Sequence, residues 1–258
     1  MSEQPRMDER GLVELDDSIP KSAKIDGHTA VIEAREMTTR KINAELRWLI
    51  YEQGVTDVTV RDPGARHSLG VAILARCRIR FEGSLGYFGC GLIDGPEVEI
   101  TGRVGWSVAE NMMSGVVVVE SNAGSLAGAA LRGGDLVVKG DVGARTGIDQ
   151  KGGTIIVLGN AASMTGFMMQ RGRQIILGDV GHGLGDSMYD GTIYVGGKVA
   201  SLGIDCVEAE WTEEDTELVE RKFSIYGLGA PPELRKLVSG KKLYNYDNLE
   251  PSERKLVL

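Results

Sequence analysis

The sequence predicts an all-β fold, a right-handed parallel β-helix of 19-residue coils with flanking N- and C-terminal helices. Glycine makes up 36 of the 258 residues while proline makes up only 7, so the glycine excess belongs neither to collagen nor to a disordered low-complexity chain. When the chain is written in rows of 19 from Leu85, glycine recurs in fixed columns without a gap. A regular repeat of this length is typical of solenoid proteins.

The glycine columns predict where each coil turns. The second column always holds Gly or Ala, and the eighteenth holds glycine in six of seven rows. We expect these glycines at the corners, because glycine accepts positive φ without strain and because stacked corners bring backbone against backbone. The structural coil glycines of the eighteenth column are Gly83, Gly102, Gly140, Gly159, Gly178 and Gly197.

A short apolar strand precedes each of these late glycines, from Ile79–Phe81 to Ile193–Val195. A βαβ unit needs about 30 residues, so strands 19 residues apart are expected to stack directly as successive coils. Corresponding residues such as Val119, Val138 and Val157 should then lie about 4.8 Å apart. Right-handedness follows from the crossover rule for parallel strands.

The flanks of the repeat predict four regions: an N-terminal arm (1–36), a capping helix (37–54), the β-helix (55–206) and a C-terminal helical extension (207–258). Residues 1 to about 30 are expected to form a flexible or partner-bound arm. We expect Thr39 to cap the first helix, and Thr212 with Asp215 to form a capping box for another. Pro231-Pro232 predicts a further short helix through Leu237.

The fifteenth column lies between two inward columns and should face outward. It begins with Arg80 and Glu99 and ends with Tyr194. Between them lie four consecutive aliphatic residues, Val118, Val137, Ile156 and Ile175. A stripe of this kind has to be covered in a soluble protein. Either the chain's own terminal helices or a partner subunit could cover it, so these four residues are a candidate interface.

Composition argues against several classes of partner. The net charge is −8 and no cluster of Lys or Arg stands out, which argues against nucleic acid and anionic membranes. No run of 18 apolar residues is present, so no transmembrane helix is expected. The three cysteines are scattered and odd in number. We therefore expect a reduced, cytoplasmic protein.

The sequence offers no clear catalytic, cofactor-binding or metal-binding residues. The histidines are few, and His67 and His182 lie near coil starts with only Asp186 close by in sequence. The glycines of 181–185 recur in every coil, so a corner role explains them better than nucleotide binding. The methionine pairs lie in or beside inward columns, which favours packing over metal ligation. The coil acids occupy different columns, unlike the clustered carboxylates of β-helical polysaccharide enzymes; they are Asp94, Glu110, Asp149, Asp186 and Asp190.

Several coil segments resemble a known family. They are Gly86-Tyr-Phe-Gly-Cys-Gly91, Ala109-Glu-Asn-Met-Met-Ser-Gly115, Leu184-Gly-Asp-Ser-Met-Tyr189 and Ser201-Leu-Gly-Ile-Asp-Cys206. Their order and spacing are similar to the GXGXG-motif domain that ends the large subunit of glutamate synthases. They look closer still to its stand-alone form, the β-helical subunit of N-methylglutamate synthase, as does Lys242-Leu-Tyr244. The resemblance covers about residues 38–248.

The resemblance implies a non-catalytic structural subunit of an enzyme complex that makes N-methylglutamate from methylamine and glutamate. It implies two partners, an amidotransferase-like subunit and a synthase subunit that carries FMN and an iron–sulfur cluster. No cofactor is expected on this chain. Three alternatives stay open: a true glutamate synthase that transfers ammonia, the β-helical subunit of a formylmethanofuran dehydrogenase, and an independent enzyme acting on a polymer or acyl substrate.

Overall fold

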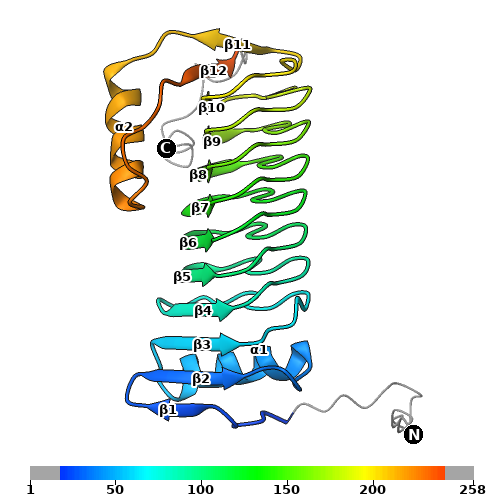
Figure 1. Cartoon of the computed structure of the whole chain (residues 1–258), viewed down its shortest axis with the longest axis vertical. Helices are drawn as coiled ribbons and strands as arrows, with labels where there is room; N and C mark the ends of the chain where they lie inside the picture. Colours follow the sequence, from blue (N-terminus) through cyan, green and yellow to red (C-terminus); the bar gives the residue numbers. More distant parts are fainter. Residues whose placement is uncertain (1–17, 242–258) are drawn as a thin grey trace, which may run out of the picture.

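The computed structural model describes residues 18–241 as a β-solenoid (Figure 1). Its strands form one sheet of 12 strands, in the order β1 to β10 followed by β12 and β11. The predicted parallel β-helix is therefore confirmed. Residues 1–17 of the predicted arm and residues 242–258 of the predicted extension, including Lys242-Leu-Tyr244, lie outside the described residues.

From Arg78 onward the coils stack in the predicted 19-residue register. The first coil departs from it, because Asp57 pairs with Arg78, which lies 21 residues later. Val119 pairs with Val138 and Val138 pairs with Val157, all in parallel strands. A second line of bridges joins the row starts from Leu85 to Val199. The coil strands are β3 (Asp57–Arg61), β4 (Arg78–Glu82), β5 (Asp94–Ile100), β6 (Ser114–Val119), β7 (Asp135–Val138), β8 (Lys151–Val157), β9 (Arg171–Ile176) and β10 (Thr192–Val195).

The glycine columns serve two different purposes. In the eighteenth column, a Cβ on Gly159 would lie 2.7 Å from the carbonyl carbon of Gly140 in the preceding coil. Glycine is needed there because two backbones approach closely, and Gly159 does not have a positive φ. In the twelfth column, Gly134 has a φ of 77° and supplies the left-handed conformation that glycine adopts most easily.

Non-glycine residues also occupy left-handed corners, which the sequence did not predict. Phe88, Ser107 and Leu126 lie one coil apart and have φ between 57° and 64°. The Phe88 N–H donates to the Trp106 carbonyl oxygen at 2.7 Å, and Leu126 N–H donates to Ala144 at 2.9 Å. Backbone hydrogen bonds between coils thus offset the strain of about 1–3 kcal/mol that such residues carry.

A ladder of short polar side chains follows the corner glycines. Asn122 Oδ1 accepts from the backbone N–H of Asp141, whose Oδ1 accepts from Asn160 at 2.7 Å. Asn160 Oδ1 accepts from Asp179, and Asp179 Oδ1 accepts from Lys198. Each of these side chains satisfies a backbone donor of the next coil, so the ladder stabilises the stack.

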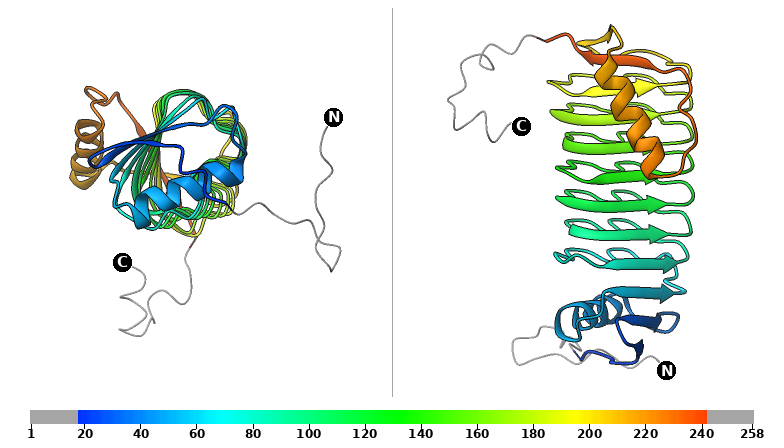
Figure 2. Two further views of the ribbon diagram at one scale, coloured as in Figure 1. Left: turned by 90° about the horizontal axis from the view of Figure 1, so that it is seen from below. Right: turned by 90° about the vertical axis from the view of Figure 1, so that its left-hand side faces the viewer.

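The N-terminal end of the solenoid is closed by a hairpin and a helix. Strands β1 (Lys24–Asp26) and β2 (Thr29–Glu33) pair antiparallel, and β2 extends the parallel sheet beside β3. Helix α1 (Thr39–Arg47) continues into the π-helix η1 (Trp48–Glu52) and lies across the end of the solenoid (Figure 2). The N-cap residue of α1 is Thr38, not the predicted Thr39.

The prediction of a flexible or partner-bound arm to about residue 30 is therefore wrong for the hairpin. Ala30 and Ile32 alternate inward and join the core at 2% and 0% exposure. The buried carboxylate of Glu45 accepts the backbone N–H groups of Ser22 and Ala23. A charged acceptor inside α1 thus fixes the approach to the hairpin.

The C-terminal end is closed by strands rather than by the predicted second helix. Strand β12 (Arg235–Ser239) pairs antiparallel with β10, and β11 (Cys206–Ala209) pairs antiparallel with β12. The predicted helix after Pro231-Pro232 is wrong because the open edge of β10 takes this segment as a strand. Helix α2 (Glu213–Ile225) has the predicted capping box of Thr212 and Asp215.

Candidate functional site

The outer face of the sheet is the surface that the coils do not explain by themselves. Helix α2 lies along the C-terminal half of this face (Figures 1 and 2). Val219 and Phe223 of α2 pack against Val137, Ile156 and Ile175, all three of which are fully buried. Val118 is partly buried at the edge of the same cluster. The sequence left open whether the chain itself or a partner covers the aliphatic stripe. In the structure, the chain's own helix α2 covers three of its four residues.

A buried carboxylate anchors the start of α2. Asp215 accepts hydrogen bonds from the Tyr194 hydroxyl at 2.6 Å, from Lys236 Nζ at 2.7 Å and from Thr212. Burial acts to raise the pKa of Asp215, but these hydrogen bonds outweigh it and lower the pKa to about 2. Burial and the bond to Asp215 raise the pKa of Tyr194. One side chain therefore ties α2 to β10 and to β12.

A second polar cluster anchors the end of α2. Lys222 Nζ lies 2.7 Å from both carboxylate oxygens of Asp135, and the Tyr226 hydroxyl donates to the same carboxylate at 2.6 Å. The side chains of Lys222 and Asp135 are only 14% and 13% exposed. Burial and the bond to Asp135 raise the pKa of Tyr226. The helix is thus held to β7 by a largely desolvated ion pair.

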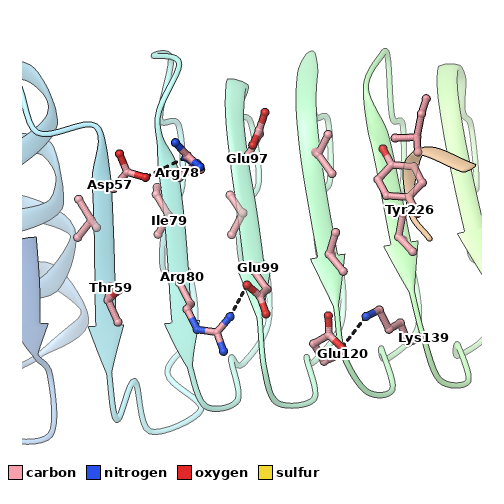
Figure 3. A pocket seen from close by; sticks show the side chains of 16 residues that line it. Asp57, Thr59, Arg78, Ile79, Arg80, Glu97, Glu99, Glu120, Lys139 and Tyr226 are labelled. Carbon is pink, nitrogen blue, oxygen red and sulfur yellow. Dashed lines mark ion pairs between the residues drawn. The ribbon is translucent and has the colours of Figure 1, made fainter. Parts of the chain in front are cut away.

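A groove of about 680 Å³ opens where α2 ends. It runs over the outer face from β3 to β7 (Figure 3). Val116 and Val118 form an apolar part of its floor, and Ile225 and Tyr226 close it at the end of α2. Ile225 is 60% exposed although it belongs to a helix with a buried face.

Charged side chains line the rest of the groove and most of them are paired. Arg78 Nε lies 2.9 Å from Asp57, and Lys139 Nζ lies 2.8 Å from Glu120. Arg80 contacts Glu99 (Figure 3). Glu97 is the exception: it is exposed and makes no ion pair within residues 18–241, because its cross-strand neighbour Arg78 is paired with Asp57. The outward charges of the fifteenth column, Arg80 and Glu99, thus lie inside this groove.

The histidines and cysteines are not assembled into a reactive cluster. His67 Nδ1 accepts the backbone N–H of Tyr87 at 2.8 Å, and His182 lies 3.3 Å from Ser201 Oγ. The three cysteines are free and buried. Burial raises the pKa of Cys90 to about 12 and that of Cys77 and Cys206 to about 11. Such thiols are poor nucleophiles at neutral pH.

The coil acids are spread over separate turns. Asp94 accepts from Ser114, Asp149 pairs with Lys151 at 3.0 Å, and Asp186 accepts from Ser187. Within residues 18–241, no group of three or more His, Cys, Asp or Glu residues could hold a metal ion. Nor does any helix in this range have the length and apolar character needed to cross a bilayer.

One surface feature went unnoticed in the sequence. His67, Tyr87 and Trp106 stack across three coils, with ring centroids 4.6 Å and 5.3 Å apart. Tyr87 and Trp106 are about half exposed. Tyr87 and Trp106 both fall in the third column of the repeat, so the sequence predicts that they are neighbours. His67 falls in the second column, because the first coil is longer than 19 residues, and the repeat therefore does not predict its place in the stack.

The fold and this outer face define a β-solenoid with one helix docked on its sheet and an open groove beyond it. Over 91 residues, the chain is 40% identical to Protein GlxC of Rhizobium meliloti (strain 1021). The match covers 34% of this chain and 39% of that protein. No family model matches the chain.

Proposed function

We propose that this chain is a cytoplasmic, non-catalytic structural subunit of a glutamate-synthase-like complex, specifically an N-methylglutamate synthase. The observation that carries the proposal is the uninterrupted series of 19-residue glycine coils, together with the GXGXG-like segments 86–91, 109–115, 184–189 and 201–206. The partial likeness to Protein GlxC supports the proposal only loosely, since it covers 34% of this chain. The name of that protein states no activity.

The outer face gives the proposal a physical basis. A scaffold needs a rigid body and a surface for partners. Backbone ladders, buried columns and closed ends supply the rigid body, and the groove beside α2 supplies a surface. In the proposed complex, FMN and the iron–sulfur cluster belong to the synthase subunit, and an amidotransferase-like subunit completes the assembly.

The test is purification of the native complex through a tag on this chain, followed by subunit identification and assay with two amines. We expect a flavoprotein and an amidotransferase-like subunit, and formation of N-methylglutamate and ammonia from glutamate and methylamine. Reductant-dependent formation of glutamate from 2-oxoglutarate and ammonia, without transfer to methylamine, would reassign the chain to a glutamate synthase. Molybdopterin or tungstopterin subunits would point to a formylmethanofuran dehydrogenase. A chain that purifies alone would contradict the scaffold proposal.

A further inference from the structure

The contacts of α2 show one way in which a helix binds the outer face of this sheet. Its apolar residues Val219 and Phe223 cover the aliphatic stripe, while Lys222 between them reaches an acid of the sheet, Asp135. In α2 the basic residue therefore has an apolar residue three positions before it and another directly after it. Such spacing places all three side chains on one face of a helix.

Glu97 repeats the position of Asp135 two coils earlier. Glu97 pairs with Val116 in the adjacent strand, and Val116 pairs with Asp135 in the next. The three residues therefore form one outward column. Asp135 is paired with a lysine, whereas Glu97 is exposed and makes no ion pair in the described part of the chain. Arg78, the next residue of this column, is already paired with Asp57. Val116 and Val118, which lie beside Glu97, form an apolar surface smaller than the stripe that α2 covers.

We propose that the groove binds a basic amphipathic helix of a partner subunit, laid end to end with α2 along the outer face of the sheet. From β3 to β7 the groove crosses four strand spacings, about 19 Å, which is the length of a helix of about 13 residues. A Lys or Arg of that helix pairs with Glu97, and its apolar residues contact Val116, Val118 and Ile225.

Two further features favour a basic occupant. The C-terminal end of α2 faces the groove through Ile225 and Tyr226, and the negative end of a helix dipole attracts cations. The other charges in the groove are already paired across strands, so Glu97 is the carboxylate left to select the partner. This inference rests on the proposed function only for the identity of that partner.

The experiment places the photocrosslinker p-benzoylphenylalanine at Val116 of the full chain in the native complex. Glu110, an acid on another face of the coils, provides the control position. We expect Val116 to crosslink to one partner subunit, at a helix whose Lys or Arg has aliphatic residues three before and one after it. The control position should not crosslink to that helix.

Charge reversal then tests the recognition itself. Glu97→Lys should lower the crosslinking yield about tenfold or more, whereas Glu110→Lys should leave it unchanged, with both isolated variants melting like the parent chain. A crosslink to a second copy, to residues 1–17 or 242–258 of the same chain, or to nothing would overturn the inference, as would a yield insensitive to Glu97→Lys. If Val116 crosslinks to a basic helix in a complex that contains no flavin, the docking inference is supported and the proposed function is contradicted.

Discussion

Gln150 and Gln174 lie inside the solenoid, where neighbouring coils place aliphatic or methionine side chains. Both are fully buried. Gln174 Nε2 donates to Gln150 Oε1 at 3.0 Å, and Gln150 Nε2 donates to the carbonyl oxygen of Gly152. Gln174 Oε1 is the buried side-chain oxygen without a partner in the described part of the chain. This amide pair lies among mostly apolar side chains and is sensitive to added charge.

Gln174→Glu should therefore lower the free energy of unfolding by at least about 3 kcal/mol at pH 7, because it places a carboxylate in the core without a cation. Burial raises the pKa of such a carboxyl, so the lost stability should return as the pH falls and the group takes up a proton. Urea unfolding at pH 7 and pH 5 measures both effects. Exposed Gln53→Glu is the control, and equal stability of the two variants would contradict an internal Gln174.

Asp215 gives the opposite pH dependence. Its pKa is lowered from 3.8 to about 2, so its contribution is present above pH 4 and is lost as the pH falls from about 4 to about 2. The shift corresponds to about 2 kcal/mol. Asp215→Asn should cost at least this much at pH 7, and the difference from the parent should shrink towards pH 2. Thermal melts across this range test it against Glu213→Gln, an exposed change in the same helical turn.

At the scale of elements, α2 is the part of the C-terminal region that the sequence predicts well. Its capping box is a local signal, and the stripe beneath it follows from counting columns. Strand β12 could not be predicted, because the short apolar run at Leu237-Val238 suits a helix or a strand equally. Its conformation is decided by β10, whose backbone groups need a partner and which lies well before it in the chain.

Ile156→Asp tests whether α2 covers the stripe in the isolated chain. Ile156 is fully buried against the cluster that contains Val219 and Phe223, so an aspartate there should cost several kcal/mol and lower the melting temperature by several degrees. Val116→Asp on the same outward face is the matched control. Val116 lies in the open groove, and we expect a loss of about 1 kcal/mol or less.

Two contrary results are informative. If both variants melt alike and near the parent temperature, α2 does not cover the stripe in solution. If both are equally destabilised, the groove is covered within the isolated chain as well.

At the scale of the whole molecule, the repeat predicts most of the fold and only part of the site. From Arg78 onward, a constant period of 19 residues determines the coils, their register and the columns of the core, since each coil contacts only its neighbours. The pairing of Lys222 with Asp135 joins residues far apart in sequence, so no local pattern predicts it. Glu97 therefore cannot be singled out from the sequence. Its equivalence to Asp135 is recognised only when α2 and its Lys222 are seen on the sheet.

The central claim is that this chain supplies structure and no catalytic group to its complex. The most direct test is turnover per flavin in complexes assembled with Asp149→Asn, His182→Gln or Asp186→Asn chains, which change the most plausible reactive side chains of the coils. We predict turnover within about twofold of the parent for each variant that assembles fully, since losing a general acid or base typically costs about a hundredfold or more. A loss of that size in a fully assembled complex would contradict the claim.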